Sequence, residues 1–164
     1  MIPETYHIAD LGKGGVAIMP RPRGNDWLEE EIQGLRVLGY DLVVSFLERS
    51  EQIELELTEE EHFCEQNGIE FISFPIRDRG VPECTAFLGL VSTLHGRIID
   101  GRRAIVHCRG GIGRAGITAA SILIRHGFSG SEAFEKVSDA RRLQVPDTEE
   151  QKLWVLAIEH QLRK

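Results

Sequence analysis

The sequence predicts a single α/β domain over residues 1–164, with a central, mostly parallel sheet that helices flank on both faces. Two observations lead to this class. Short apolar runs typical of strands alternate along the chain with longer segments that have helical periodicity. The length of 164 residues suits one domain with a substantial core, and no repeat, linker or low-complexity stretch divides it.

The expected strands are short apolar runs at residues 5–8, 15–19, 42–47, 70–74 and 103–107. A glycine-rich turn at residues 12–15 separates the first two strands. The run at 42–47 contains no charged residue, so this strand is expected to be buried.

The expected helices are defined mainly by their ends. One helix is expected from Asp26, with Glu29 completing a capping-box-like pair, to about residue 38. The others are expected from Thr58 to Gly68, at 85–100, at 115–126, from a cap at Ser131, and from a cap at Asp147 or Thr148. Because the segment 115–126 is apolar on nearly every side, it should be the central buried helix.

The most informative motif joins the strand at 103–107 to this central helix. Cys108 and Arg114 enclose Arg109, Gly110, Gly111, Ile112 and Gly113. Small residues let consecutive N–H groups turn inward as an anion-binding nest, and the helix N-terminus favours negative charge at the same point. Arg114 could hold two phosphoryl oxygens, and the same field favours the thiolate of Cys108. The motif therefore predicts a phosphate-binding loop with a sulfur nucleophile.

The alternative for this motif is an ordinary strand–turn–helix whose cysteine is a small buried apolar residue. The glycines, the flanking elements and the spacing together favour the phosphate site instead. His107 is not needed as a base if the sulfur is ionised, so we expect it to hydrogen-bond the loop and fix its shape.

Asp78 lies 30 residues before the cysteine, in a loop bounded by Pro and Gly that follows the expected strand 70–74. Attack of a thiolate on a phosphate ester expels an alkoxide or phenoxide, which requires a proton donor. The carboxyl ends of parallel strands meet at one sheet edge, so this loop should lie beside the phosphate loop. We interpret Asp78 as the general acid; the alternative is an ordinary turn aspartate.

These residues resemble the cysteine-dependent protein tyrosine and dual-specificity phosphatases. Pro-Ile-x-Asp-x-Gly-x-Pro at 75–82 and Val-Pro-Asp-Thr-x-x-Gln at 145–151 are similar to the small branch that contains the cyclin-dependent-kinase-associated phosphatase. The resemblance spans about residues 40–160 and implies the tyrosine-phosphatase fold. It implies hydrolysis of phosphomonoesters through a phosphocysteine, with Cys108 as nucleophile, Arg114 as phosphate clamp and Asp78 as acid.

Gln151 and Ala115 are two further positions that bear on hydrolysis of the phosphocysteine. Gln151 matches a family position that helps place the hydrolytic water; the alternative is a solvated helix residue. The family usually has Ser or Thr after the arginine, where its hydroxyl would ease departure of the cysteine sulfur, but this chain has Ala115. We therefore expect slow breakdown of the phosphocysteine. Thr118 lies one helical turn further on, and is expected to bond its own backbone.

Composition limits the function further. The net charge of −7 argues against nonspecific nucleic-acid binding and against attraction to an anionic membrane. Three cysteines with no metal-type spacing suit a reducing compartment, so a cytoplasmic protein without metal or cofactor is expected. Cys64 or Cys84 could trap an oxidised Cys108 as a disulfide, although each is more readily interpreted as an inert buried cysteine.

The charged residues give further expectations. The acidic run from Glu48 to Glu61 is interpreted as a solvated helical face. Arg77, Arg79 and Arg109 should lie near the pocket mouth, where they could bind a second phosphate or an acidic peptide flank; the alternative is solvated surface arginines.

The leading functional hypothesis is an enzyme acting on phosphorylated proteins, at phosphotyrosine and also at phosphoserine or phosphothreonine, because the short chain suggests a shallow site. One alternative is a phosphatase of inositol phosphates, nucleotides or RNA ends. Another is a phosphoprotein-binding module with little turnover.

Overall fold

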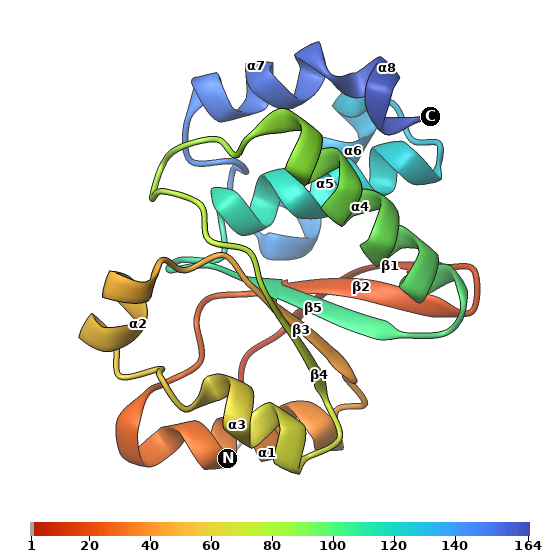
Figure 1. Ribbon diagram of the computed structural model, residues 1–164. Helices are drawn as coiled ribbons and strands as arrows, with labels where there is room; N and C mark the ends of the chain where they lie inside the picture. Colours follow the sequence, from red (N-terminus) through yellow and green to blue (C-terminus); the bar gives the residue numbers. More distant parts are fainter. Residues whose placement is uncertain (1) are drawn as a thin grey trace.

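The computed structural model describes residues 2–164 and has one five-stranded sheet between two layers of helices (Figure 1). The strands are β1 (Tyr6–Leu11), β2 (Gly14–Met19), β3 (Leu42–Ser45), β4 (Glu70–Ser73) and β5 (Arg103–His107). Their order is β1-β2-β5-β3-β4, and β1 runs antiparallel to β2 while the other neighbours are parallel. The predicted class, an α/β fold with a mostly parallel sheet, is confirmed.

The helices form a larger and a smaller layer. They are the 3-10 turn η1 (Asn25–Trp27), α1 (Leu28–Val37), α2 (Arg49–Glu54), α3 (Glu60–Gln66), α4 (Cys84–Ile99), α5 (Arg114–His126), α6 (Gly130–Arg141), α7 (Glu149–Ala157) and α8 (Glu159–Leu162). Figure 1 shows α4 to α8 on one side of the sheet and α1 and α3 on the other. Within residues 2–164, none of these helices is long and apolar enough to cross a membrane.

Each side of the sheet has its own hydrophobic core, because successive strand residues point to opposite faces. In β5, Val106 belongs to the larger core with the α5 residues, whereas Ile105 belongs to the smaller core with α1 and α3. Both cores cover β5, and α5 is buried from Arg114 to Ile124 as expected for the central helix. The loop between them is therefore held by two rigid elements.

The parallel strands β3, β4 and β5 end at the same edge of the sheet. Ser45, the last residue of β3, is in register with His107, the last residue of β5, and with Ser73 at the end of β4. The observed strand β3 ends at Ser45 and is therefore shorter than the predicted strand at 42–47, although Phe46 and Leu47 are buried. The segments that leave these three strands therefore begin side by side.

Three of the expected helix starts are wrong. The turn η1 precedes α1, so Asp26 caps nothing, and α3 begins at Glu60 without a cap from Thr58. Ser129 rather than Ser131 caps α6, because its hydroxyl accepts from the N–H of Glu132. Of the two candidates for α7, Thr148 is the cap.

Candidate active site

The phosphate loop, residues 108–114, connects the end of β5 to the N-terminus of α5. Cys108 is only 3% exposed, and its Sγ accepts a hydrogen bond from the Ala115 N–H at 3.5 Å. The sulfur therefore lies at the positive end of the α5 dipole. The positive end of a helix dipole stabilises negative charge, such as that of a bound anion.

Two arginines from outside the loop hold its carbonyl groups. Arg141 donates from Nε to the Gly111 oxygen at 3.1 Å and from Nη2 to the Gly110 oxygen at 3.0 Å. Arg21 donates its backbone N–H at 3.3 Å and its Nη1 at 3.2 Å to the Arg109 oxygen. In a planar trans peptide the C=O and the next N–H point in opposite directions. These contacts therefore turn consecutive N–H groups toward the inside of the loop.

Neither of these arginines was found from the sequence, because both come from distant segments with no recognisable spacing. Arg141→Met is expected to weaken inhibition by inorganic phosphate by about tenfold, since losing hydrogen bonds from a charged donor costs on the order of 1.5–3 kcal/mol. The inhibition constant of phosphate measures this. Arg142→Met is the matched control, because its exposed side chain makes no contact with the loop in the described residues. Equal inhibition constants for both variants would contradict the assignment.

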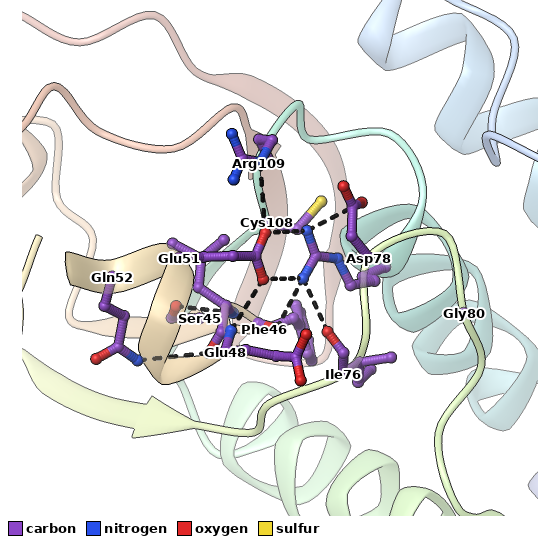
Figure 2. A network of polar contacts seen from close by, with 12 residues as sticks. Ser45, Phe46, Glu48, Glu51, Gln52, Ile76, Asp78, Gly80, Cys108 and Arg109 are labelled. Carbon is purple, nitrogen blue, oxygen red and sulfur yellow. Dashed lines mark hydrogen bonds and ion pairs between the residues drawn. The ribbon is translucent and has the colours of Figure 1, made fainter. Parts of the chain in front are cut away.

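Arg114 is the centre of a buried network of polar contacts (Figure 2). Its Nη1 and Nη2 donate to the two carboxylate oxygens of Glu51, at 2.7 and 2.9 Å. Nη1 also donates to the Ile76 carbonyl at 2.8 Å and to the Phe46 carbonyl at 3.3 Å. Segments after β3, β4 and β5 thus converge on one guanidinium, which is fixed before any phosphate arrives.

Asp78 lies beside this guanidinium, in the acid loop (residues 74–83) between β4 and α4. Its Oδ1 accepts from Nη2 of Arg114 at 3.1 Å, and about half of its side chain is exposed. Figure 2 shows the Cys108 sulfur and the Asp78 carboxylate pointing the same way from the network. The structure therefore brings together the three residues that the sequence analysis singled out for catalysis.

The acidic run 48–61 is only in part the solvated face that the sequence suggested, since Glu54, Glu56, Glu59 and Glu61 are exposed. Glu51 and Glu60 are both buried. Glu51 is the counter-charge of the buried Arg114, and Glu60 contacts the buried His107. Burial by itself raises the pKa of Glu51, but hydrogen bonds from Arg114 and from the Glu48 backbone outweigh it and lower the pKa to about 2. Glu51 therefore stays ionised under Arg114.

His107 is completely buried next to the nucleophile. Its Nε2 lies 2.6 Å from Oε2 of Glu60, and its Nδ1 lies 3.3 Å from the Cys108 carbonyl oxygen. These contacts fix the ring behind the phosphate loop. The geometry suits a residue that orients the loop, and Glu60 is its partner that the sequence analysis missed.

Gln151 is completely buried, so its alternative interpretation as a solvated helix residue is wrong. Its Oε1 accepts from the Thr148 N–H at 3.2 Å, and its Nε2 donates to the Gly80 carbonyl at 3.1 Å. The side chain thus ties the start of α7 to the acid loop.

The three arginines expected at the pocket mouth differ in their contacts. Arg77 and Arg79 are exposed and flank Asp78. Arg109 instead extends toward α2, where it donates to Glu54 at 3.0 Å and to Glu51 at 3.4 Å. Their binding of a second phosphate or an acidic flank stays a prediction.

The side chains of the remaining candidate residues lie outside the site. Thr118 donates its hydroxyl to the Arg114 carbonyl at 2.9 Å, as expected for a helix threonine. Cys64 lies in the smaller core, on the other side of the sheet from Cys108, and burial together with nearby acids raises the pKa of its thiol. Cys84 is half-buried at the start of α4. In the described part of the chain, no three His, Cys, Asp or Glu side chains are grouped to hold a metal.

A sheet edge that carries a cysteine loop, a buried arginine and an aspartate loop defines the class of cysteine-type phosphatase domains. Residues 8–154 match the family model described as "PTP-SAK: Swiss Army Knife protein, DSP-PTPase phosphatase domain". The chain belongs to this family of dual-specificity and tyrosine-phosphatase domains, and the predicted resemblance is confirmed.

Similar proteins agree with this assignment. Cyclin-dependent kinase inhibitor 3 of Rattus norvegicus is 25% identical over 116 residues, which are 70% of this chain and 55% of that protein. Tyrosine phosphatase 197R, as it is named in Invertebrate iridescent virus 6, is 36% identical over 62 residues, 35% of this chain and 23% of its own. The matched regions thus cover less than two thirds of these relatives.

Among solved structures, kinase associated phosphatase with its catalytic-site cysteine changed to serine has a TM-score of 0.86 at 19% identity, over 99% of this chain and 97% of that one. PTPMT1 has a TM-score of 0.78 at 20% identity, over 97% and 96% of the two chains. At these identities the likeness shows the shared fold.

Proposed function

We propose that this protein dephosphorylates phosphorylated proteins through a phosphocysteine intermediate. The observation that carries the proposal is the position of the Cys108 sulfur at the N-terminus of α5, with Arg114 and Asp78 grouped beside it. A nucleophile, a bidentate cation and a carboxyl group at one point are the parts that phosphoryl transfer to sulfur requires.

The first chemical step uses all three residues. The Cys108 thiolate attacks phosphorus, the bond from phosphorus to the leaving oxygen breaks, and Asp78 gives that oxygen a proton. Arg114 and the inward N–H groups hold the remaining phosphoryl oxygens, whose charge spreads in the transition state. In this account Glu51 fixes Arg114 and His107 fixes the loop, so the donors need little rearrangement during the reaction.

The proposed substrate class rests on two supports. The overall charge of −7 disfavours anionic lipid surfaces, and the names of two similar proteins refer to kinases, which act within phosphoprotein signalling. One observation favours a second candidate, a phosphoinositide, because PTPMT1 has also been solved in complex with PI(5)P.

A comparison of substrates tests the proposal. We expect kcat/KM to be at least about tenfold higher for phosphotyrosine, phosphoserine or phosphothreonine peptides than for dispersed PI(5)P or inositol phosphates, a difference of ~1.4 kcal/mol in transition-state binding. A preference for PI(5)P would overturn the protein substrate. Tight binding of phosphopeptides without release of phosphate would instead support a binding module.

The alanine after Arg114 leads to a prediction about the second chemical step. Ala115 offers the sulfur a backbone N–H but no hydroxyl, so sulfur should be a poor leaving group and the phosphocysteine should accumulate. Rapid-quench measurements with para-nitrophenyl phosphate are expected to show a burst of product. Ala115→Ser is expected to abolish this burst and raise steady-state turnover by about tenfold, the effect of one hydrogen bond of ~1.4 kcal/mol to a charged sulfur.

The matched control for this substitution is Ala119→Ser, one helical turn further along the buried α5. It adds the same hydroxyl away from the sulfur and should leave the burst in place. A burst that is absent from the parent protein, or unchanged by Ala115→Ser, would contradict the prediction.

A further inference from the structure

The guanidinium of Arg141, which donates to the carbonyls of Gly110 and Gly111, has no carboxylate partner. Among residues 2–164, no ion pair includes Arg141, whereas Arg114 is paired with Glu51. Arg141 is half-buried and is the last residue of α6. Its positive charge is therefore not cancelled by a neighbouring carboxylate, and it acts on the loop in full.

An aromatic ring takes the place of a carboxylate beside this guanidinium. Cζ of Arg141 lies over the ring of Tyr6, 4.5 Å from the ring centroid, well inside the separation of about 6 Å at which cations and aromatic faces attract. The ring face attracts a cation without carrying a net charge. Tyr6 can thus hold Arg141 against the phosphate loop without placing a negative charge beside an anion site.

Tyr6 is itself held in place by its own neighbours. It is the first residue of β1, where it is in register with the buried Ile18 of β2, and it packs against the larger core. Its hydroxyl donates to the carboxylate of Glu4, and this hydrogen bond raises the pKa of Tyr6. The phenol therefore stays neutral, and the ring has a fixed orientation before any phosphate binds.

The partner strand of β1 supports the same loop from its other end. β2 ends at Met19, and a methyl group placed on Gly111 would lie 2.4 Å from the Met19 carbonyl oxygen. Two residues later, Arg21 donates its backbone N–H and its side chain to the Arg109 oxygen. The two N-terminal strands thus carry contacts to both sets of loop carbonyls that face outward.

We propose that Tyr6 is a positioning residue for phosphate binding that acts through Arg141; this rests on the proposed function, in which residues 108–114 bind the substrate phosphate. With the ring in place, Arg141 keeps the carbonyls of Gly110 and Gly111 turned outward, so the N–H groups that follow them face the phosphate. Without the ring, the guanidinium gains side-chain freedom, and fixing it on the loop costs more entropy. The first strand of the sheet thereby contributes to phosphate affinity.

The dissociation constant of inorganic phosphate, measured by isothermal titration calorimetry, tests this role. Tyr6→Leu, which removes the ring but keeps apolar bulk, is expected to raise the constant by about fivefold, or ~1 kcal/mol, the scale of a cation–π contact. Tyr6→Phe keeps the ring face and loses only the bond to Glu4, so its constant should stay within about twofold of the parent value. Trp27→Leu is the matched control: Trp27 lies 4.8 Å from Cζ of Arg23, which donates to Glu31, and phosphate binding should not change.

A double substitution separates positioning from a general loosening of the fold. In the Arg141→Met background, Tyr6→Leu is expected to raise the dissociation constant by less than about twofold, because the contact that it removes is already absent. A full fivefold effect in that background would show that Tyr6 acts by a route other than Arg141 and would overturn the proposal.

The remaining outcomes keep this proposal distinct from the proposed function. Parent-like phosphate binding in Tyr6→Leu would overturn the role of Tyr6, and so would equal weakening in Tyr6→Phe and Tyr6→Leu. Turnover of para-nitrophenyl phosphate by the parent protein reports on the proposed function separately. Phosphate binding that depends on Tyr6 but occurs without turnover would overturn the phosphatase and leave the positioning role standing. A parent protein that binds no inorganic phosphate would overturn both.

Discussion

Cys108→Ser is expected to lower turnover of para-nitrophenyl phosphate by about 10⁴-fold or more, the scale of loss when a catalytic nucleophile is removed. The physical reason is that a serine hydroxyl is a much weaker nucleophile than a cysteine sulfur unless a base activates it. The substitution nearly preserves shape at a site that is only 3% exposed, so the fold and phosphate binding should be retained.

The measurement combines turnover with the dissociation constant of a phosphopeptide. We expect binding to be unchanged or tighter, because the variant lacks the negative sulfur beside the phosphate. Cys84→Ser is the matched control, since Cys84 is half-buried at the start of α4, outside the phosphate loop. Retention of more than about 1% of parent turnover would mean that sulfur is not the nucleophile.

Glu51→Gln is expected to lower the free energy of unfolding by about 3–5 kcal/mol, because it leaves the Arg114 guanidinium buried without its counter-charge. Urea denaturation measures this loss. Glu54→Gln is the control: its exposed carboxylate pairs with Arg109, and such an exposed pair should cost about 0.5 kcal/mol or less when lost. Similar losses in both variants would show that the buried Glu51–Arg114 pair stabilises the fold no more than the exposed Glu54–Arg109 pair does.

The dependence of the free energy of unfolding on acid pH gives an independent check on the Glu51–Arg114 ion pair. Its pKa is lowered from 4.5 to about 2 in the folded protein, so its contribution is fully present above pH 4.5 and is lost as pH falls toward 2. The parent protein should therefore lose its advantage over Glu51→Gln across this window. An advantage that persists below pH 2 would contradict the ion pair.

Local patterns in the sequence predicted much of the molecule correctly. The strand at 103–107, the loop from Cys108 to Arg114 and the buried helix after it are continuous in the chain, so spacing and periodicity were enough to predict them. Periodicity likewise predicted the buried face of α4: Phe87, Val91, Leu94 and Ile98. Helix starts were less reliable, because a residue type that favours caps can lie near a helix start without capping it, as Asp26, Thr58 and Ser131 do.

The acidic residues show where such patterns are insufficient. The sequence from Glu48 to Glu61 fits a solvated face, and no local pattern distinguishes Glu51 and Glu60 from their exposed neighbours. Their partners lie 63 and 47 residues away, at Arg114 and His107. A carboxylate can be buried only where an opposite charge or donor meets it, and that meeting depends on the packing of α2 and α3.

The sequence by itself therefore determined the fold class and the loop from Cys108 to Arg114, since each follows from short-range spacing and periodicity. Only the tertiary structure decided what holds that loop in shape. Arg21 and Arg141 orient its carbonyls, and Glu51 fixes Arg114. These contacts join segments that are distant in the chain, and folding alone brings their charges within hydrogen-bonding distance.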